Sequence, residues 1–182
     1  MRNLFLGLVL SAVAAAPAAA RPYTVDKAAS RLGFTASMGG QPINGTFQRW
    51  DATIDFDPSN LPASRASVTV DVSSASTGDR TRDGALGGAE WFGAGQHPRA
   101  TFVTRAITRT GPNRYQAAGD LTIRGVRRPV VLPFTLQLNG TTARMQGRLT
   151  LDRNSFGVGR GQAASAVAPQ VTAVVDLTAR TR

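Results

Sequence analysis

The sequence predicts an all-β fold, a barrel or a sandwich of about eight antiparallel strands with one or two short helices. Apolar and polar residues alternate with the two-residue period of a half-buried strand in many runs along the chain. Two of these runs meet at Asn139-Gly140, a dipeptide typical of a two-residue hairpin turn. Only residues 77–97 lose the alternation and take up helical spacing. The regular spacing of strands and the near-absence of helix favour one closed or sandwiched sheet.

The expected strands are separated by turn and loop signals in the sequence. A Pro-rich loop at 57–62 follows the third strand, and the Gly-Pro pair within 110–113 marks a later turn. Residues 154–169 are rich in Gly and Ala and are expected to form a long loop. The expected strands cover residues 23–26, 32–37, 45–57, 67–72, 100–109, 114–124, 130–138, 142–151 and 171–178.

The segment 77–97 is expected to form one or two short helical turns. Asp79 or Thr81 provides a side-chain cap for the first turn. Trp91 and Phe92 follow among several glycines, and such a segment is a poor isolated helix. Its aromatic side chains must therefore be buried against the sheet.

The first twenty residues are expected to be a secretory signal peptide. Arg2 supplies the positive start, residues 4–16 an apolar stretch, and residues 18–20 a small-residue cleavage site after Ala20. The remaining residues, 21–182, have the length of one domain. Cysteine is absent, which excludes disulfides and an acylated cysteine anchor. We expect a periplasmic or secreted protein.

The chain is strongly basic, with a formal net charge of +10, and Lys27 is its only lysine. Scattered arginines favour solubility and a weak, transient attraction to anionic membrane surfaces, and they do not predict nucleic-acid binding. An outer-membrane barrel needs aromatic girdles, which two tyrosines, Tyr23 and Tyr115, and two tryptophans, Trp50 and Trp91, cannot build. We expect a soluble protein that does not span the membrane. The sequence leaves a homodimer open.

The ionisable residues predict no catalytic or metal site. His97 is the only histidine, so neither a histidine metal cluster nor a Ser-His relay is expected. The 11 carboxylates lie mostly at strand ends and turns, where capping explains them singly. Asp120 with Arg124, and Arg82 with Asp83, are interpreted as structural ion pairs. No enzyme activity and no cofactor are expected.

Several separated motifs resemble one known family. Residues 119–130, GDLTIRGVRRPV, are similar to the signature segment of the YceI-like family. Departures from the family pattern fall at Ala85, Trp91, Gly93 and His97. Further similarity lies in residues 44–47, 54–58, 71–78, 82–83, Leu86, Phe92, Pro98, Phe102, Arg153, Phe156 and Gly157.

The resemblance implies a secreted barrel of lipocalin-like shape that binds a polyisoprenoid or another long-chain lipid. Trp91, Phe92 and Phe102 are expected to close its mouth, and Arg80, Arg82 and Arg153 are the candidates for contact with the ligand head group. The residues alone also allow two alternatives. One is a structural or stress-related envelope protein whose core is filled by side chains, and the other, less favoured, is a carboxylate hydrolase. The expected tunnel residues are Phe34, Phe56, Trp91, Phe92, Phe102, Leu121, Ile123, Phe134 and Leu149.

Overall fold

The computed structural model describes residues 20–181, and all of the strands in this range belong to one antiparallel sheet. The expected signal peptide, residues 1–20, lies outside the described residues apart from Ala20. Successive residues of a strand point to opposite faces, so the period-2 runs place their apolar members on one face. The strands are β1 (Arg21–Val25), β2 (Arg31–Met38), β3 (Gln41–Phe47), β4 (Trp50–Phe56), β5 (Arg65–Asp71), β6 (Ala75–Ser76), β7 (Arg99–Gly111), β8 (Arg114–Ile123), β9 (Val126–Asn139), β10 (Thr142–Asp152) and β11 (Gln170–Thr181).

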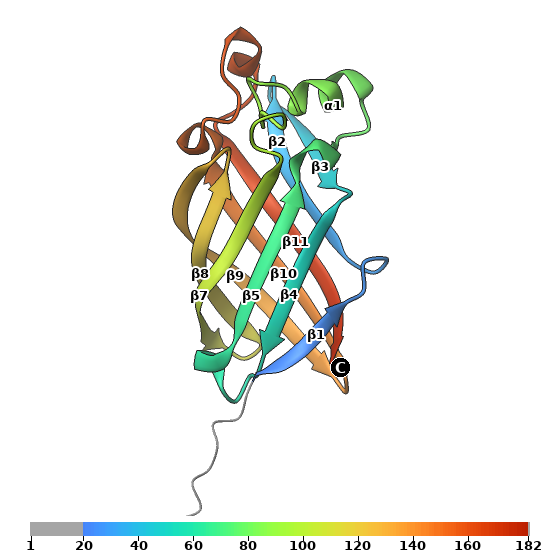
Figure 1. Ribbon diagram of the computed structural model, residues 1–182, viewed down its shortest axis with the longest axis vertical. Coiled ribbons are helices and arrows are strands. Elements are labelled where there is room, and N and C mark those ends of the chain that lie inside the picture. Colours follow the sequence, from blue (N-terminus) through green and yellow to red (C-terminus); the bar gives the residue numbers. More distant parts are fainter. Residues whose placement is uncertain (1–19, 182) are drawn as a thin grey trace, which may run out of the picture.

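The sheet closes into a barrel because β1 pairs with β4 on one side and with β11 on the other. The closed ring runs β1-β4-β5-β7-β8-β9-β10-β11, which confirms the predicted barrel of about eight strands. Strand β11 pairs with β1 over Ala179–Thr181 and with β2 over Thr172–Asp176. Strands β2, β3 and β6 therefore extend the wall beyond the point where β1 ends (Figure 1).

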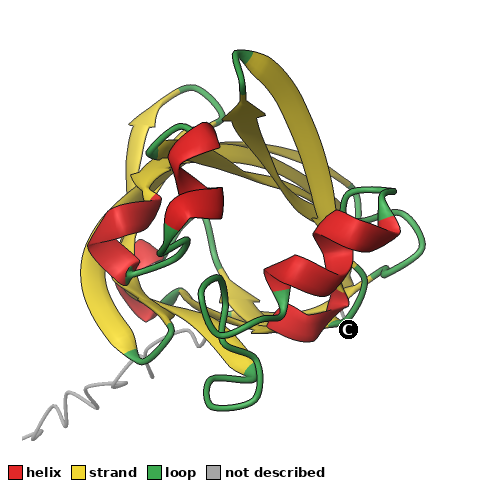
Figure 2. Ribbon diagram, turned by 90° about the horizontal axis from the view of Figure 1, so that it is seen from above, coloured by secondary structure: helices red, strands yellow, loops and turns green. Residues whose placement is uncertain are grey.

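Short helices gather at one end of the barrel, which we call the upper end (Figures 1 and 2). The helix α1 (Arg80–Leu86) begins where the Asp79 side chain accepts a hydrogen bond from the backbone N–H of Arg82, as the predicted cap requires. The 3₁₀ helices η3 (Arg153–Phe156) and η4 (Gln162–Ala166) lie beside it, so the loop expected at 154–169 is partly helical. The remaining 3₁₀ helices are η1 (Leu61–Ala63) and η2 (Val72–Ser74).

Most strands differ from their expected limits by one to three residues, and two differences are larger. The strand expected at 45–57 is broken into β3 and β4 at residues 48–49, where the chain bonds to the β5–β6 connection. Strand β9 begins at Val126, earlier than expected, because Arg124 and Gly125 make the turn alone, with φ of 51° and 73°. Two successive residues with positive φ match the right-handed twist of the flanking strands. The strand then passes through Pro129, which lies in the gap between the strands expected at 114–124 and 130–138.

Candidate functional site

The inward faces of the barrel strands surround an apolar cavity of about 230 Å³, which we call the lower chamber. Its wall is supplied by nearly every strand of the ring and consists mainly of Ala, Val, Leu, Ile and Phe side chains. No described Asp, Glu, Lys or Arg lines it. A close-packed interior has few voids larger than a water molecule, so this volume is too large to be a packing defect.

A second cavity of about 320 Å³, the upper chamber, lies between β2, β3, α1 and the η3–η4 segment. It is also mainly apolar, with Met38, Leu86 and Val167 in its wall. The chambers adjoin, because Gly33, Phe47, Phe92, Ile123, Leu151 and Ala173 line both.

The structure places all nine expected tunnel residues on these walls. Phe102 lies in the barrel wall on β7, between Val68 and Leu121, and not with Trp91 and Phe92 at the upper end. It therefore does not close the mouth as expected. Phe56, Phe102, Leu121, Phe134 and Leu149 line the lower chamber, Phe34 and Trp91 the upper chamber, and Phe92 and Ile123 both.

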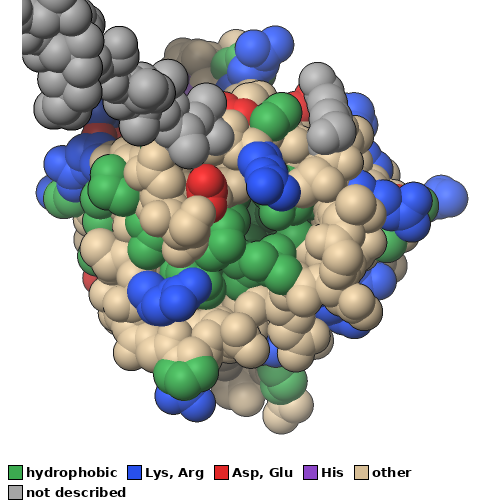
Figure 3. Space-filling view, turned by 90° about the horizontal axis from the view of Figure 1, so that it is seen from below, with side chains coloured by type: hydrophobic (Ala, Val, Ile, Leu, Met, Phe, Trp, Pro, Cys, Tyr) green, Lys and Arg blue, Asp and Glu red, His purple; other side chains and the backbone are tan. Residues whose placement is uncertain are grey.

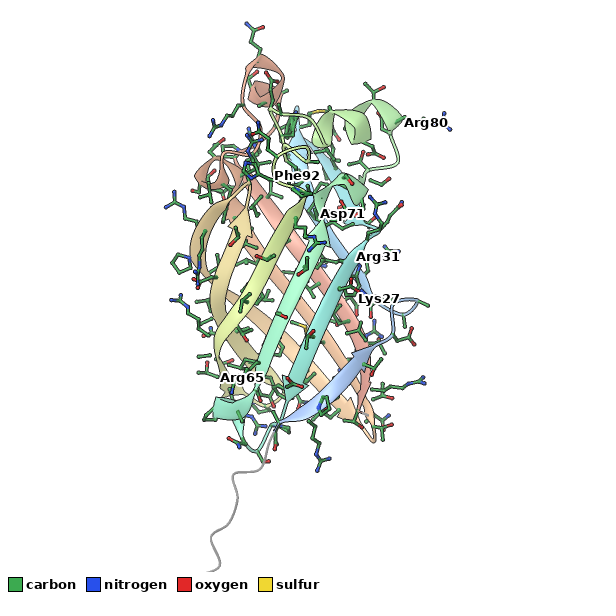
Figure 4. All side chains as sticks on the ribbon, in the orientation of Figure 1. Lys27, Arg31, Arg65, Asp71, Arg80 and Phe92 are labelled. Atoms are coloured by element: carbon green, nitrogen blue, oxygen red, sulfur yellow. The ribbon has the colours of Figure 1, made fainter. Side chains whose placement is uncertain are left out.

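Aromatic rings connect the upper-end segment to the wall. Phe47 lies 5.5 Å from Phe34 and 5.9 Å from Phe92, measured between ring centroids. Figure 4 shows Phe92 at the upper end of the barrel, below the helical segments. Phe47 was not among the expected tunnel residues. Its place in the family-like motif at 44–47 was the signal that could have found it.

Arg153 has a structural role at the upper end. The side chain is buried, 8 % exposed, and its guanidinium group makes six hydrogen bonds. A guanidinium group has five N–H donors, so these bonds engage its donating capacity. The acceptors are the carbonyl oxygens of Val158, Gly159, Ala164, Val167 and Ala168 and the side-chain oxygen of Asn154.

The other two expected head-group residues differ in position. Arg80 points away from the barrel at the start of α1 (Figure 4). Arg82 lines the upper chamber, donates to the Thr77 hydroxyl at 3.1 Å and has Asp79 at 4.0 Å. The expected Arg82–Asp83 pair is wrong, because Asp83 instead accepts hydrogen bonds from residues 76 and 77.

Those hydrogen bonds lower the pKa of Asp83, with the backbone N–H of Thr77 the largest cause and the Thr77 hydroxyl the next. The expected pair of Asp120 with Arg124 is also wrong. Asp120 pairs with Arg105 at 3.5 Å and with Arg127, while Arg124 donates to the Trp91 carbonyl. Arg124 thereby holds the segment after α1 against the β8–β9 turn.

The opposite, lower end carries the hairpin turns at 112–113 and 140–141 and the helix η1. Figure 3 shows this end as a hollow lined by apolar side chains, with basic side chains around it. Tyr115, which is 3 % exposed, stacks on Phe134 at 5.4 Å and meets the edge of Phe56 at 5.7 Å. The barrel is therefore covered by helices at one end and hollowed at the other.

Within residues 20–181, no helix is long and apolar enough to cross a membrane. The same residues contain no group of three or more His, Cys, Asp or Glu side chains arranged to hold a metal ion.

Fold and cavity together define a class: small closed antiparallel barrels with a hollow, apolar interior. The model of the YceI-like domain matches residues 23–179, so the chain belongs to the YceI-like family. A UPF0312 protein of Pseudomonas savastanoi pv. phaseolicola is 32% identical over 162 residues, which is 84% of each chain.

Two solved structures have the same fold. The crystal structure of BcnA from Burkholderia cenocepacia matches with a TM-score of 0.82 and 35% identity, over 85% of this chain and 99% of that one. A polyisoprenoid binding domain from Saccharophagus degradans, implicated in plant cell wall breakdown, matches with a TM-score of 0.72 over 88% of this chain and 98% of its own. At 18% identity, this second match shows the fold alone.

Proposed function

We propose that this protein binds a polyisoprenoid or another long-chain amphipathic lipid inside the barrel and acts as a carrier, without catalysis. The observation that carries the proposal is the pair of adjoining apolar chambers, which run from the lower half of the barrel to the helices at the upper end. The fold is shared with a domain described as polyisoprenoid binding, which agrees with the proposal. The nine tunnel residues named from the sequence are proposed to contact the tail.

Burial of the tail supplies the affinity. Each methylene group removed from water gains roughly 0.8 kcal/mol, so ten carbons gain about 8 kcal/mol gross. Association costs at least about 4 kcal/mol of this, so ten carbons leave roughly millimolar affinity, and about fifteen buried carbons are needed for a carrier of roughly micromolar affinity. The chambers lack lining carboxylates and offer few polar contacts, so selection for the tail is expected to depend on its length more than on its identity.

The alternatives from the sequence are less well supported. A structural envelope protein with a filled core does not need two large apolar chambers. A carboxylate hydrolase needs two acids across a cleft. Instead, Asp57, Asp71 and Asp83 accept hydrogen bonds from backbone N–H groups in turns, and no described carboxylate lines either chamber.

The proposed location is the periplasm or the medium, after cleavage of residues 1–20. The basic character of the chain supports transient contact with a membrane surface, where lipid would be collected or delivered. A homodimer is not needed for the cavity, because one chain supplies both chambers.

The test is organic extraction of the natively purified protein followed by mass spectrometry of the extract. Ala173 borders both chambers, so Ala173→Phe places a ring at their junction and should shorten or abolish the lipids recovered. Val174→Phe is the matched control, since the next residue of β11 faces outward and should leave recovery unchanged. Recovery of no lipid from the wild-type protein, or equal recovery from Ala173→Phe, would contradict the proposal.

A further inference from the structure

The lower end contains an arginine that faces the barrel interior. Arg109 on β7 lies directly opposite Tyr115 on β8, and opposed residues of an antiparallel pair share a face. Its guanidinium group donates to the Tyr115 hydroxyl at 2.7 Å and lies 5.3 Å from the centre of that ring. Because Tyr115 is buried between Phe56 and Phe134, the charge is held at the rim of the apolar hollow.

A second arginine reaches the same rim from another strand. Arg21 on β1 lies opposite Phe56, which is 6 % exposed and faces inward, so Arg21 shares the inner face. Within residues 20–181 it makes no hydrogen bond or salt bridge by its side chain, although its charge acts on Tyr23 and Asp57. Cleavage after Ala20, as proposed above, would add a free α-ammonium group beside it.

We propose that Arg109 and Arg21 bind the anionic head group of the ligand, a carboxylate or a phosphate, at the lower end of the barrel. This inference rests on the proposed function and gives the lipid a direction: tail toward α1, head toward the β7–β8 turn. It moves the head group away from Arg80, Arg82 and Arg153, the residues expected from the sequence. An exposed guanidinium on an aromatic ring keeps N–H groups available to an incoming oxyanion.

The orientation follows from the free-energy cost of placing a charged head group at each end of the barrel. At the upper end Arg153 already donates to six oxygen acceptors, and Arg82 is engaged by Thr77 and Asp79. A charged head group there would have to leave water beneath the helices and compete with these bonds. At the lower end the head group would keep much of its hydration while the tail enters the chambers.

The experiment compares palmitate with its methyl ester, which share a tail and differ in charge. Dissociation constants are measured by titration calorimetry for the wild-type protein and for Arg109→Gln, Arg21→Gln and the double variant. Two matched controls are Arg80→Gln, whose side chain points away from the barrel at the upper end, and Arg114→Gln, an arginine of the same lower hairpin on the outward face. Circular dichroism confirms that each variant is folded.

We expect the wild-type protein to prefer palmitate, and the double variant to bind palmitate at least about tenfold more weakly, because two charge-assisted hydrogen bonds are lost. Binding of the methyl ester should not change, and both controls should behave as wild type. Equal binding of palmitate and ester by the wild type, or loss of preference in Arg80→Gln or Arg114→Gln alone, would overturn the inference while leaving the carrier function intact. Failure of both ligands to bind the wild type would instead refute the proposed function.

Discussion

At the upper end of the barrel a buried arginine, Arg153, donates its hydrogen bonds to the chain segment that folds over it. At the lower end Arg21 and Arg109 lie at the rim of the apolar hollow that Figure 3 shows. The same side chain therefore fills two roles according to its surroundings. Where carbonyl oxygens converge on the guanidinium, it organises the fold. Where a single side chain contacts it, as Tyr115 contacts Arg109, the guanidinium keeps N–H groups available to a ligand.

The arginines at the two ends also differ in hydration. A buried cation must replace its hydration by hydrogen bonds. Arg153 does so with uncharged acceptors only, and it makes no salt bridge within the described residues. An exposed cation keeps its water until a ligand displaces it. The upper end is thus expected to govern stability and the lower end to govern ligand recognition.

The largest expected effect is that of Arg153→Met. The substitution removes the guanidinium donor from five backbone carbonyls between Val158 and Ala168 and should lower the free energy of unfolding by about 3–5 kcal/mol. Arg153→Lys should rescue little, because an ammonium cannot reproduce the planar fork of donors. Urea denaturation measures both. The exposed Arg80→Met is the control and should change stability by no more than about 0.5 kcal/mol. A loss for Arg153→Met as small as that of the control would show that the upper end is not organised by this side chain.

A smaller effect is expected from Tyr115→Phe at the lower end. The variant keeps the ring stack with Phe134 and loses only the hydroxyl that accepts from Arg109, so stability should fall by about 1 kcal/mol or less. Affinity for palmitate should nevertheless weaken, because the guanidinium is no longer held at the rim. Parallel calorimetry and denaturation separate the two readouts. A large loss of stability with unchanged affinity would reverse the roles that we assign to the two ends.

The smallest effect concerns acid stability through Asp83. Hydrogen bonds from Thr77 and Ser76 lower the pKa of this carboxyl in the folded protein below the value of about 3.9 that is usual for aspartate. A lowered pKa contributes stability that is complete above the unfolded-state pKa and is lost as the pH falls through the folded-state pKa. Asp83→Asn should therefore have a lower urea midpoint than the wild-type protein at pH 7. At about pH 2 the difference between the two midpoints should be smaller. A difference in urea midpoint that grows as the pH falls would contradict a lowered pKa of Asp83.

Much of the barrel could be predicted from local pattern. Alternation located most strands, Asn139-Gly140 located a hairpin, and Asp79 located the start of α1. The role of Arg153 could not be predicted, because its carbonyl acceptors lie in residues 158–168 that fold back over it. The inward direction of Arg109 could not be predicted for another reason. A register shift between Thr104 and Ala106 changes the parity of β7, so that Arg109 faces inward although strict alternation from Phe102 places it outside.

The central claim is that one lipid lies along the barrel with its head at the lower end, and anomalous diffraction from a bromine-labelled ligand tests it most directly. The wild-type protein is crystallised with a long-chain fatty acid that carries bromine on its terminal carbon. The account predicts an anomalous peak in the upper chamber, near Phe92 and Trp91, with the carboxylate at Arg109. A peak at the lower rim would reverse the proposed orientation, and a peak outside the barrel would contradict the account altogether.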